Sequence, residues 1–459
     1  MSTPNIILIN CDDLGYGDLG CYGSTKNDTP HLDQLAAEGM RFTDFYMASA
    51  VCSASRAAML TGCYPQRIGF ARNEVLSPGQ NVGLHPNEST IADALKKVGY
   101  RTKIVGKWHC GDQPAFLPTA HGFDEYFGIP YSNDMGRQVN RLNAPPLPLL
   151  RNEEVIQEQP DQRGITERYT EECIRFIRSN QSKPFFLYFA HMYVHVPLFI
   201  PKPFLDISRN GAYGGAVGCI DWAMGVLDRE LERLGLRENT LVIFTSDNGS
   251  RAKDEGGSNA PLRGRKSQTW EGGQRVPMVA RWPGHIKEGS LSNGIASSID
   301  LYATLCDLVG TDLPKNPIDS HSLRETLLEA EPTPRDTFAF YRGGTLEALR
   351  SGDWKLHFHK DIWRDEDNGL SKTHELYNLR QDIGESQDLA KEHPELVIEL
   401  EAQAESFRLA FGDVSRGITG KDIRPMGQVE HPKPLTQYDE SHPYMIASYD
   451  LADMPTMTG

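Results

Sequence analysis

The sequence predicts an α/β fold, in which a large, mostly parallel sheet lies between helices and a smaller α+β domain follows. Over roughly the first two-thirds of the chain, short apolar runs alternate with amphipathic stretches. This alternation is typical of a parallel sheet that helices cover on both faces. Beyond a Pro-rich segment at 330–335, four short alternating runs indicate an antiparallel sheet.

The larger domain is expected to span residues 1–334. Its apolar runs predict strands, and its amphipathic stretches predict helices, such as the one that begins at Thr29-Pro30 and ends at Gly39. The expected strands are 6–9, 102–105, 184–190 and 241–245, and the expected helices are 29–39, 88–99 and 215–234. The segment 138–160 is rich in Pro, Asn and Leu, and it is interpreted as a surface insertion.

The smaller domain is expected to span residues 335–459, because a single core rarely grows beyond ~300 residues. The expected antiparallel strands are 337–341, 346–350, 354–359 and 375–379, followed by an amphipathic helix at 394–409. From Ser415 the chain is polar and poorly periodic. We expect this tail to wrap over the surface rather than to fold alone.

Composition and charge exclude several kinds of partner. The 459 residues carry a formal net charge of −15 and no extended basic patch, which argues against nucleic acid. No apolar run approaches the ~20 residues that span a bilayer, so no membrane partner is expected. No signal peptide is visible, so the protein is expected to be soluble: periplasmic or secreted if a leader was removed, and otherwise cytoplasmic. The oligomeric state is left open.

The eight cysteines contain no CxxC pair and are too few for a disulfide scaffold.

Polar side chains follow four of the predicted strands. The pairs are Asp12 and Asp13, Lys107 and His109, His191 and His195, and Asp247 and Asn248. In open parallel sheets, ligands bind outside the carboxyl ends of the strands. These side chains are therefore expected to meet at one edge of the sheet and to form a site.

The acids and the amide among them are hard oxygen donors. Asp12, Asp13, Asp247 and Asn248 suit Ca²⁺ or Mg²⁺ far better than zinc. Taken locally, the two aspartates could be a helix cap with its turn, and Asp247-Asn248-Gly249 could be a turn. Their common position after strands of one sheet favours the metal.

The string from Cys52 to Gly62 reads CSASRAAMLTG. Alone, Cys52 would be interpreted as a small buried residue. The whole string resembles the sulfatase signature, C-x-(P/A)-S-R followed by L-T-G, in which the cysteine is oxidised to formylglycine. Many members have Pro where this chain has Ala54, and the alanine variant also occurs in the family.

Further strings extend the resemblance over about residues 5–310, with a weaker match through ELYNL at 375–379. They are GKWH at 106–109, HGFD at 121–124, FGIPYS at 127–132, HVPL at 195–198, TSDNG at 245–249, LRGRKSQTWEGGQRVP at 262–277 and WPG at 282–284. They resemble the branch that contains arylsulfatase A and N-acetylgalactosamine-6-sulfatase. This resemblance implies an alkaline-phosphatase-like fold and a sulfuric ester hydrolase.

The resemblance also implies roles at the matched positions. Asp12, Asp13, Asp247, Asn248 and the modified residue 52 would hold Ca²⁺; Arg56 would hold the formylglycine; Lys107, Lys266 and Ser132 would bind the sulfate; and His109 and His195 would be catalytic. An enzyme that generates formylglycine is the implied maturation partner. His191 has no matched position and is interpreted as structural.

These roles fit the chemistry of sulfate esters. The ester is an anion that repels nucleophiles, so cations must face its oxygens. A hydrated aldehyde offers one hydroxyl for attack and a second for expelling sulfate. His195 would protonate the leaving oxygen, and His109 would take the proton from the second hydroxyl.

The substrate is expected to be a sulfated small molecule or glycan, and more specifically a sulfated carbohydrate. Asp134 and Arg137, just past Ser132, and the insertion that follows them are candidates for contacts to the sugar, and the C-terminal domain and tail could close another side of the site. Asp134 and Arg137 could instead form a surface ion pair of little energetic value. Three alternatives stay open. They are an aryl sulfatase of broad specificity, a phosphonate or phosphate monoester hydrolase on the same scaffold, and a silent protein that binds sulfated glycans.

Overall fold

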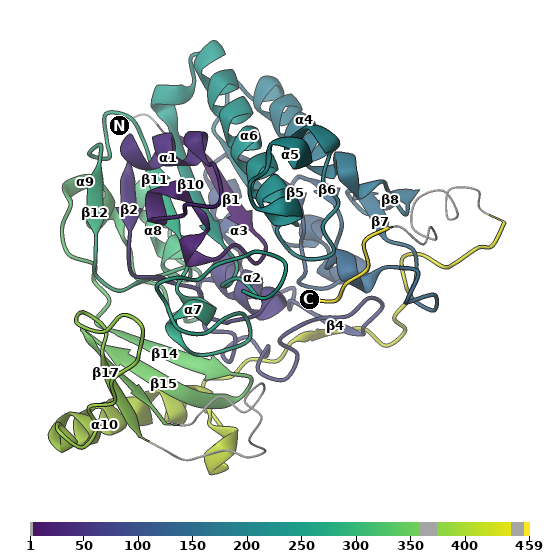
Figure 1. Cartoon of the computed structure of the whole chain (residues 1–459). Coiled ribbons are helices and arrows are strands. Elements are labelled where there is room, and N and C mark those ends of the chain that lie inside the picture. Colours follow the sequence, from purple (N-terminus) through teal and green to yellow (C-terminus); the bar gives the residue numbers. More distant parts are fainter. Residues whose placement is uncertain (1–2, 359–373, 442–453) are drawn as a thin grey trace.

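The computed structural model describes residues 3–358, 374–441 and 454–459. A ten-stranded sheet forms its centre (Figure 1). Its strands in spatial order are β12 (Ser290–Ser292), β2 (Met40–Phe42), β11 (Met278–Arg281), β10 (Thr240–Ser246), β1 (Asn5–Cys11), β9 (Phe185–Ala190), β5 (Arg101–Gly106), β6 (Glu125–Gly128), β7 (Pro148–Arg151) and β8 (Glu154–Glu158). The five strands from β10 to β6 are parallel to one another. The predicted mostly parallel sheet is therefore confirmed.

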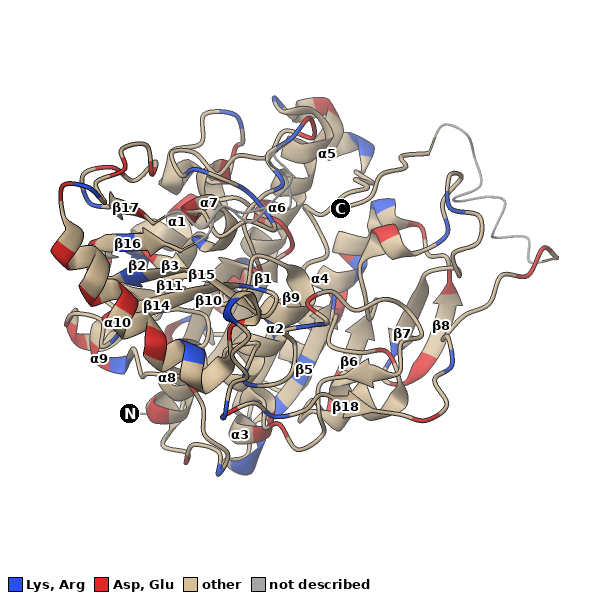
Figure 2. Ribbon diagram, turned by 90° about the horizontal axis from the view of Figure 1, so that it is seen from below, with Lys and Arg blue, Asp and Glu red and all other residues tan. Residues whose placement is uncertain are grey.

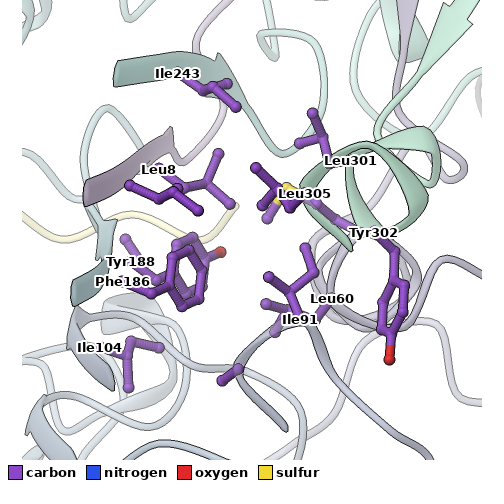
Figure 3. Close-up of a cluster of buried hydrophobic side chains, with 14 of the residues drawn as sticks. Leu8, Leu60, Ile91, Ile104, Phe186, Tyr188, Ile243, Leu301, Tyr302 and Leu305 are labelled. Atoms are coloured by element: carbon purple, nitrogen blue, oxygen red, sulfur yellow. The ribbon is translucent and has the colours of Figure 1, made fainter. Parts of the chain in front are cut away.

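Helices cover both faces of this sheet. One face packs against α1 (Pro30–Ala37), α4 (Ile165–Ser179) and α6 (Gly211–Arg233), and the other packs against α2 (Cys52–Thr61), α3 (Ile91–Lys97) and α8 (Asp300–Val309). Alternation along β1 divides its side chains, so that Ile7 and Ile9 join the first layer while Ile6 and Leu8 join the second. Figure 3 shows Leu8 in the second layer, together with Leu60 of α2, Ile91 of α3 and Leu301 of α8.

The predicted strands and helices of this region all form, within a few residues of their expected ends. The interpretation of 138–160 as a surface insertion is wrong in part. Its second half forms β7 and β8, which extend the main sheet beyond β6. Leu147, Leu149 and Leu150 are fully buried there, so the leucines of the segment belong to the core.

The smaller sheet is antiparallel, as predicted. Its order is β14 (Thr337–Arg342), β15 (Thr345–Ser351), β16 (Trp354–His357) and β17 (Glu375–Asn378), and α10 (Pro394–Phe411) packs on it. Residue 359 of the expected third strand lies outside the described residues. The chain between α9 (Arg324–Glu329) and β14 contains the expected boundary at 334, and a division into two domains at that point stays a prediction.

The tail follows the surface of the larger part of the chain. β18 (Gly427–Gln428) pairs with β4 (Val82–Gly83), and Arg424 forms an ion pair with Glu88 at 2.6 Å. Residues 442–453 of this predicted tail lie outside the described residues. Figure 2 shows acidic and basic residues dispersed over many elements of the ribbon, with several of the acids along α10. Among the described residues, none of the helices combines the length and the apolar character that crossing a bilayer requires.

Candidate active site

The four predicted pairs of polar residues lie at one edge of the sheet, because β10, β1, β9 and β5 are parallel neighbours. The first residue of each pair directly follows the end of its strand. The eight side chains Asp12, Asp13, Lys107, His109, His191, His195, Asp247 and Asn248 are all buried. The structure therefore brings to one place residues that are more than 230 positions apart in the chain.

Helix α2 carries the signature string to the same edge. Cys52 is the first residue of this helix, and its Sγ lies 3.4 Å from Oδ1 of Asp12. One turn later, Arg56 donates from Nε to Oδ2 of Asp247 at 2.8 Å and from Nη1 to the carbonyl of Lys107 at 2.9 Å. The spacing of four residues places both side chains on the same face of the helix. Arg56 thus ties the helix to the ends of two strands.

The acidic residues offer oxygen atoms to a cation. Ligand atoms of Asp12, Asp13, Cys52 and His195 all lie within 4.8 Å of one another. Asn248 donates from Nδ2 to Oδ1 of Asp13 at 2.7 Å, while its own Oδ1 is buried and has no hydrogen-bond partner. A buried polar atom without a partner is costly, so an orphaned oxygen beside carboxylates fits a metal ligand.

The charges around these acids favour the same interpretation. Lys107 donates to Asp12 at 2.5 Å and Lys266 donates to Asp13 at 3.0 Å. Burial acts to raise the pKa of Asp12, but Lys107, His195 and Arg56 together lower it. The pKa of Asp247 is raised, first by burial and then by the charge of Asp12. A divalent cation among these groups would keep Asp247 ionised, so the residues fit a hard cation such as Ca²⁺.

The hydrogen bonds of His109 and His195 assign the ring nitrogen that carries the proton. Nε2 of His109 lies 2.9 Å from the carbonyl oxygen of Leu76, and Nδ1 of His195 lies 2.6 Å from that of Val196. A carbonyl only accepts, so these nitrogens are the donors. Nδ1 of His109 has no hydrogen-bond partner and can accept a proton, and so can Nε2 of His195, whose contact with Oγ of Ser132 is long at 3.4 Å.

The electrostatic surroundings keep both rings neutral. Burial lowers the pKa of His109, and the charge of Lys107 lowers it further. Burial likewise lowers the pKa of His195, with Lys266 as the next cause. Neutral rings can act as bases at neutral pH.

The remaining predicted residues lie at different distances from this centre. Oγ of Ser132 is 3.4 Å from both ring nitrogens of His195. His191 is buried against Phe189, with ring centroids 3.9 Å apart, and burial lowers its pKa to about 3. Both observations agree with a structural role for His191.

Asp134 and Arg137 are both buried, so they do not form a surface ion pair. Asp134 lies near the site, where its Oδ2 accepts from the backbone N–H of Gly459 at 2.9 Å. The guanidinium of Arg137 lies over the ring of Tyr438, 3.5 Å from its centroid. Contacts of either residue to a sugar stay predictions.

Arg251 beside the site escaped the sequence analysis, whereas Gln138 begins the insertion and 454–459 ends the tail that were expected near the mouth of the site. Gln138 and Arg251 each contact Met457 of the segment 454–459, next to Asp134. None of them belongs to a recognised string, and the segment is distant in sequence from all the others. The signal in the sequence for Arg251 is its position four residues after Asp247.

Comparisons with known proteins agree with this geometry. The Sulfatase family model matches residues 4–311, and the model described as the C-terminal region of aryl-sulfatase matches residues 333–425. The chain is 43% identical to N-acetylgalactosamine-6-sulfatase of Rattus norvegicus over 376 residues, which are 77% of this chain and 71% of that protein. It is 41% identical to Arylsulfatase A of Homo sapiens over 423 residues, 84% of this chain and 83% of that protein.

A solved structure is also similar. Ps i-CgsB, solved in complex with k-i-k-neocarrahexaose, superposes with a TM-score of 0.78 at 31% identity, over 88% of this chain and 93% of that chain. The two sheets and their helices are thus shared with proteins whose sequences also match.

Proposed function

Because this chain belongs to the sulfatase family, and is a sulfatase, we propose that it hydrolyses a sulfate monoester of a carbohydrate with a formylglycine made from Cys52 and with Ca²⁺. The observation that carries the proposal is the position of Cys52. It begins α2, is buried, and lies 3.4 Å from Asp12 within reach of the charges of Lys107 and Lys266.

The thiol itself is unsuited to be the nucleophile. Burial raises its pKa well above the ordinary value, and the charge of Asp12 raises it further. A thiol that keeps its proton at neutral pH is a poor nucleophile. This supports a modified residue at position 52, because the formylglycine, once hydrated, supplies one hydroxyl for attack on sulfur and a second for release of sulfate.

Two lysines bind the anion, and one arginine helps to balance the charge of the acids. Although burial opposes it, Asp12 raises the pKa of Lys107, and Asp13 raises that of Lys266. Both ammonium groups therefore stay charged and face the sulfate oxygens. Arg56 stays bound to Asp247 and holds α2 in place. Ca²⁺, when bound by Asp12, Asp13, Asp247 and Asn248, supplies further positive charge to the sulfate oxygens.

The two histidines move protons. His109 accepts a proton at Nδ1, the nitrogen that its bond to Leu76 leaves free. His195 takes a proton at Nε2 when the anionic ester binds, because the added negative charge favours the imidazolium. It then passes this proton to the leaving oxygen.

The carbohydrate assignment rests on relatives of this chain. N-acetylgalactosamine-6-sulfatase is named for a sulfated sugar, and Ps i-CgsB was solved with a carrahexaose. The 41% identity to Arylsulfatase A favours a second candidate, an aryl sulfatase of broad specificity.

One experiment tests both the nucleophile and the substrate class. We expect turnover of N-acetylgalactosamine 6-sulfate at a kcat/KM at least about tenfold above that of 4-nitrophenyl sulfate, which corresponds to ~1.4 kcal/mol of transition-state discrimination. The mass of the peptide that contains residue 52 should show the loss expected when an aldehyde replaces the thiol, in proportion to activity. Cys52→Ala should fold and be inactive.

The controls separate the alternatives. 4-Nitrophenyl phosphate and a phenyl phosphonate ester should turn over more slowly than the aryl sulfate. Full activity of protein whose residue 52 is entirely unmodified would remove the nucleophile from the proposal. If the aryl sulfate is cleaved efficiently and no sulfated sugar of a broad panel is cleaved, the carbohydrate assignment is wrong and the protein is an aryl sulfatase of broad specificity.

A further inference from the structure

The segment 454–459 lies beside the site, where the yellow end of the chain in Figure 1 returns to the middle of the molecule. Three side chains hold it. The N–H of Gly459 donates to Asp134 at 2.9 Å, and the N–H of Met457 donates to Oε1 of Gln138 at 3.1 Å. Nη1 of Arg251 lies 3.2 Å from Sδ of Met457.

Gly459 stands directly against the catalytic edge of His195. A Cβ added to Gly459 would lie 2.2 Å from both Cε1 and Nε2 of that ring. The other ring nitrogen is bound to the carbonyl of Val196, so Nε2 is the nitrogen that faces the reaction. A leaving oxygen must come within ~2.6–3.2 Å of it. Gly459 and the leaving oxygen therefore cannot be there together.

We propose that segment 454–459 occupies the place of the substrate beside His195, and that Asp134, Gln138 and Arg251, which hold it, form the subsite for the sugar. This inference rests on the proposed function, because it takes His195 as the residue that meets the leaving oxygen. The segment has neither helix nor strand, and four of its six residues are exposed. Its polar contacts with other described residues come from main-chain atoms and one sulfur, so an entering substrate can displace it.

The three side chains suit an acidic, hydroxylated ligand. Oδ1 of Asp134 is buried without a hydrogen-bond partner and can accept from a sugar hydroxyl. Gln138 already serves the segment as donor and acceptor at once. Within the described parts of the chain, Nε of Arg251 has no hydrogen-bond partner, and no carboxylate lies within 4.0 Å of its guanidinium. The subsite thus favours a sulfated sugar whose neighbouring unit carries a carboxylate or a second sulfate.

Deletion of residues 454–459 tests the competition. If the segment fills the site about nine-tenths of the time, its removal lowers KM for N-acetylgalactosamine 6-sulfate about tenfold and leaves kcat nearly unchanged. Gly459→Ala should act in the same direction, because its Cβ cannot fit against His195. Thr458→Ala, at an exposed neighbour, is the matched control and should change nothing. An unchanged or higher KM in the deletion variant would overturn the proposal, whereas no sulfatase turnover in any form would overturn the proposed function instead.

A second measurement avoids turnover. In Cys52→Ala protein, the amides of Met457 and Gly459 should exchange hydrogen faster when N-acetylgalactosamine 6-sulfate is added at saturation. Unchanged exchange with the ligand bound would contradict displacement.

The charge preference has its own test. In the deletion variant, Arg251→Gln should lower kcat/KM for a sulfated disaccharide with a uronic acid more than for N-acetylgalactosamine 6-sulfate, and Arg251→Lys should restore much of the difference. Equal losses on both substrates would remove Arg251 from the subsite.

Discussion

At the scale of single residues, the site consists of buried acids and cations that neutralise one another in part. Asp13 has a positive φ of 64°, a conformation that places its N–H 3.2 Å from Oδ1 of Asp247. Asn248 then bonds to Asp13 and keeps its own Oδ1 without a partner. Lys107 and Arg56 offset part of the negative charge. The orphaned oxygen and the raised pKa of Asp247 both indicate room for one more positive charge.

We therefore expect that Ca²⁺, when it is added to protein from which metal was removed by chelation, raises the free energy of unfolding. At a free concentration of 100 times Kd, a ligand that binds only the folded state adds about 2.7 kcal/mol to the free energy of unfolding. Thermal unfolding with and without Ca²⁺ measures this, and Mg²⁺ should add less because it keeps its waters. Asn248→Ala should weaken the effect. Asp221 is a buried carboxyl that accepts from the N–H of Leu32 of α1, and Asp221→Asn should leave the stabilisation by Ca²⁺ unchanged. Full sulfatase activity after exhaustive chelation would contradict a catalytic metal.

At the scale of elements, α7 (Glu271–Gln274) joins the segment that carries Lys266 to the smaller sheet. Nζ of Lys355 on β16 lies 2.9 Å from Glu271 and 3.0 Å from Glu385. Arg275 contacts Glu271 at 3.1 Å from the other side. Burial acts to raise the pKa of Glu271, but Lys355, Arg275 and Arg350 together lower it. The smaller sheet thus fixes the loop that delivers Lys266 to the site.

Glu271→Gln should lower the free energy of unfolding by about 3–5 kcal/mol near neutral pH, because it leaves buried cations without their partner. The native pKa of Glu271 lies below the unfolded value of about 4.5, so the carboxylate stabilises the fold above that pH. This stabilisation is lost as the pH falls below 4.5. Denaturant unfolding between pH 7 and pH 3 should therefore show that the difference in the free energy of unfolding between the wild-type protein and Glu271→Gln becomes smaller as the pH falls. Glu329→Gln, at an exposed position, is the control, and a gap independent of pH would contradict this account.

At the scale of the whole molecule, one apolar cluster joins the larger part of the chain to the smaller sheet and α10. Tyr46 stacks on Phe338 with ring centroids 5.0 Å apart, and Tyr64 lies 5.3 Å from Phe411. Tyr46 and Tyr64 come from the larger part of the chain, and the two phenylalanines come from β14 and α10. The smaller domain therefore shares its core with the catalytic part.

This shared core predicts that the chain unfolds in one calorimetric transition. Phe338→Ala should shift the whole transition to lower temperature, by a loss of about 3–5 kcal/mol, without splitting it. Ile398→Ala, at a side chain that is 71% exposed, should shift it little. Two separate transitions would show that the parts fold independently.

The fold class and most of the candidate site could be predicted from the amino-acid sequence. Local chemistry carries this information, because the string at Cys52 and the polar pairs after the strands are contiguous in the chain. Parallel strands end at one edge, so Asp12, Lys107, His195 and Asp247 could be expected together before any contact was known. The two strands inside 138–160 could not be recognised, since buried leucines in a Pro-rich segment have no clear period.

The surroundings of this centre could not be predicted, because they depend on contacts between distant parts of the chain. Strand order places β1 between β10 and β9, and pairing between distant strands depends on packing rather than on local pattern. Folding of the tail also brings Gly459 to Asp134, which is 325 positions away, and Met457 to Arg251, which is 206 positions away. Such contacts are made by single backbone amides and side-chain tips, which have neither periodicity nor motif. Their existence follows from the folded shape alone, and so does the subsite that we propose for the sugar.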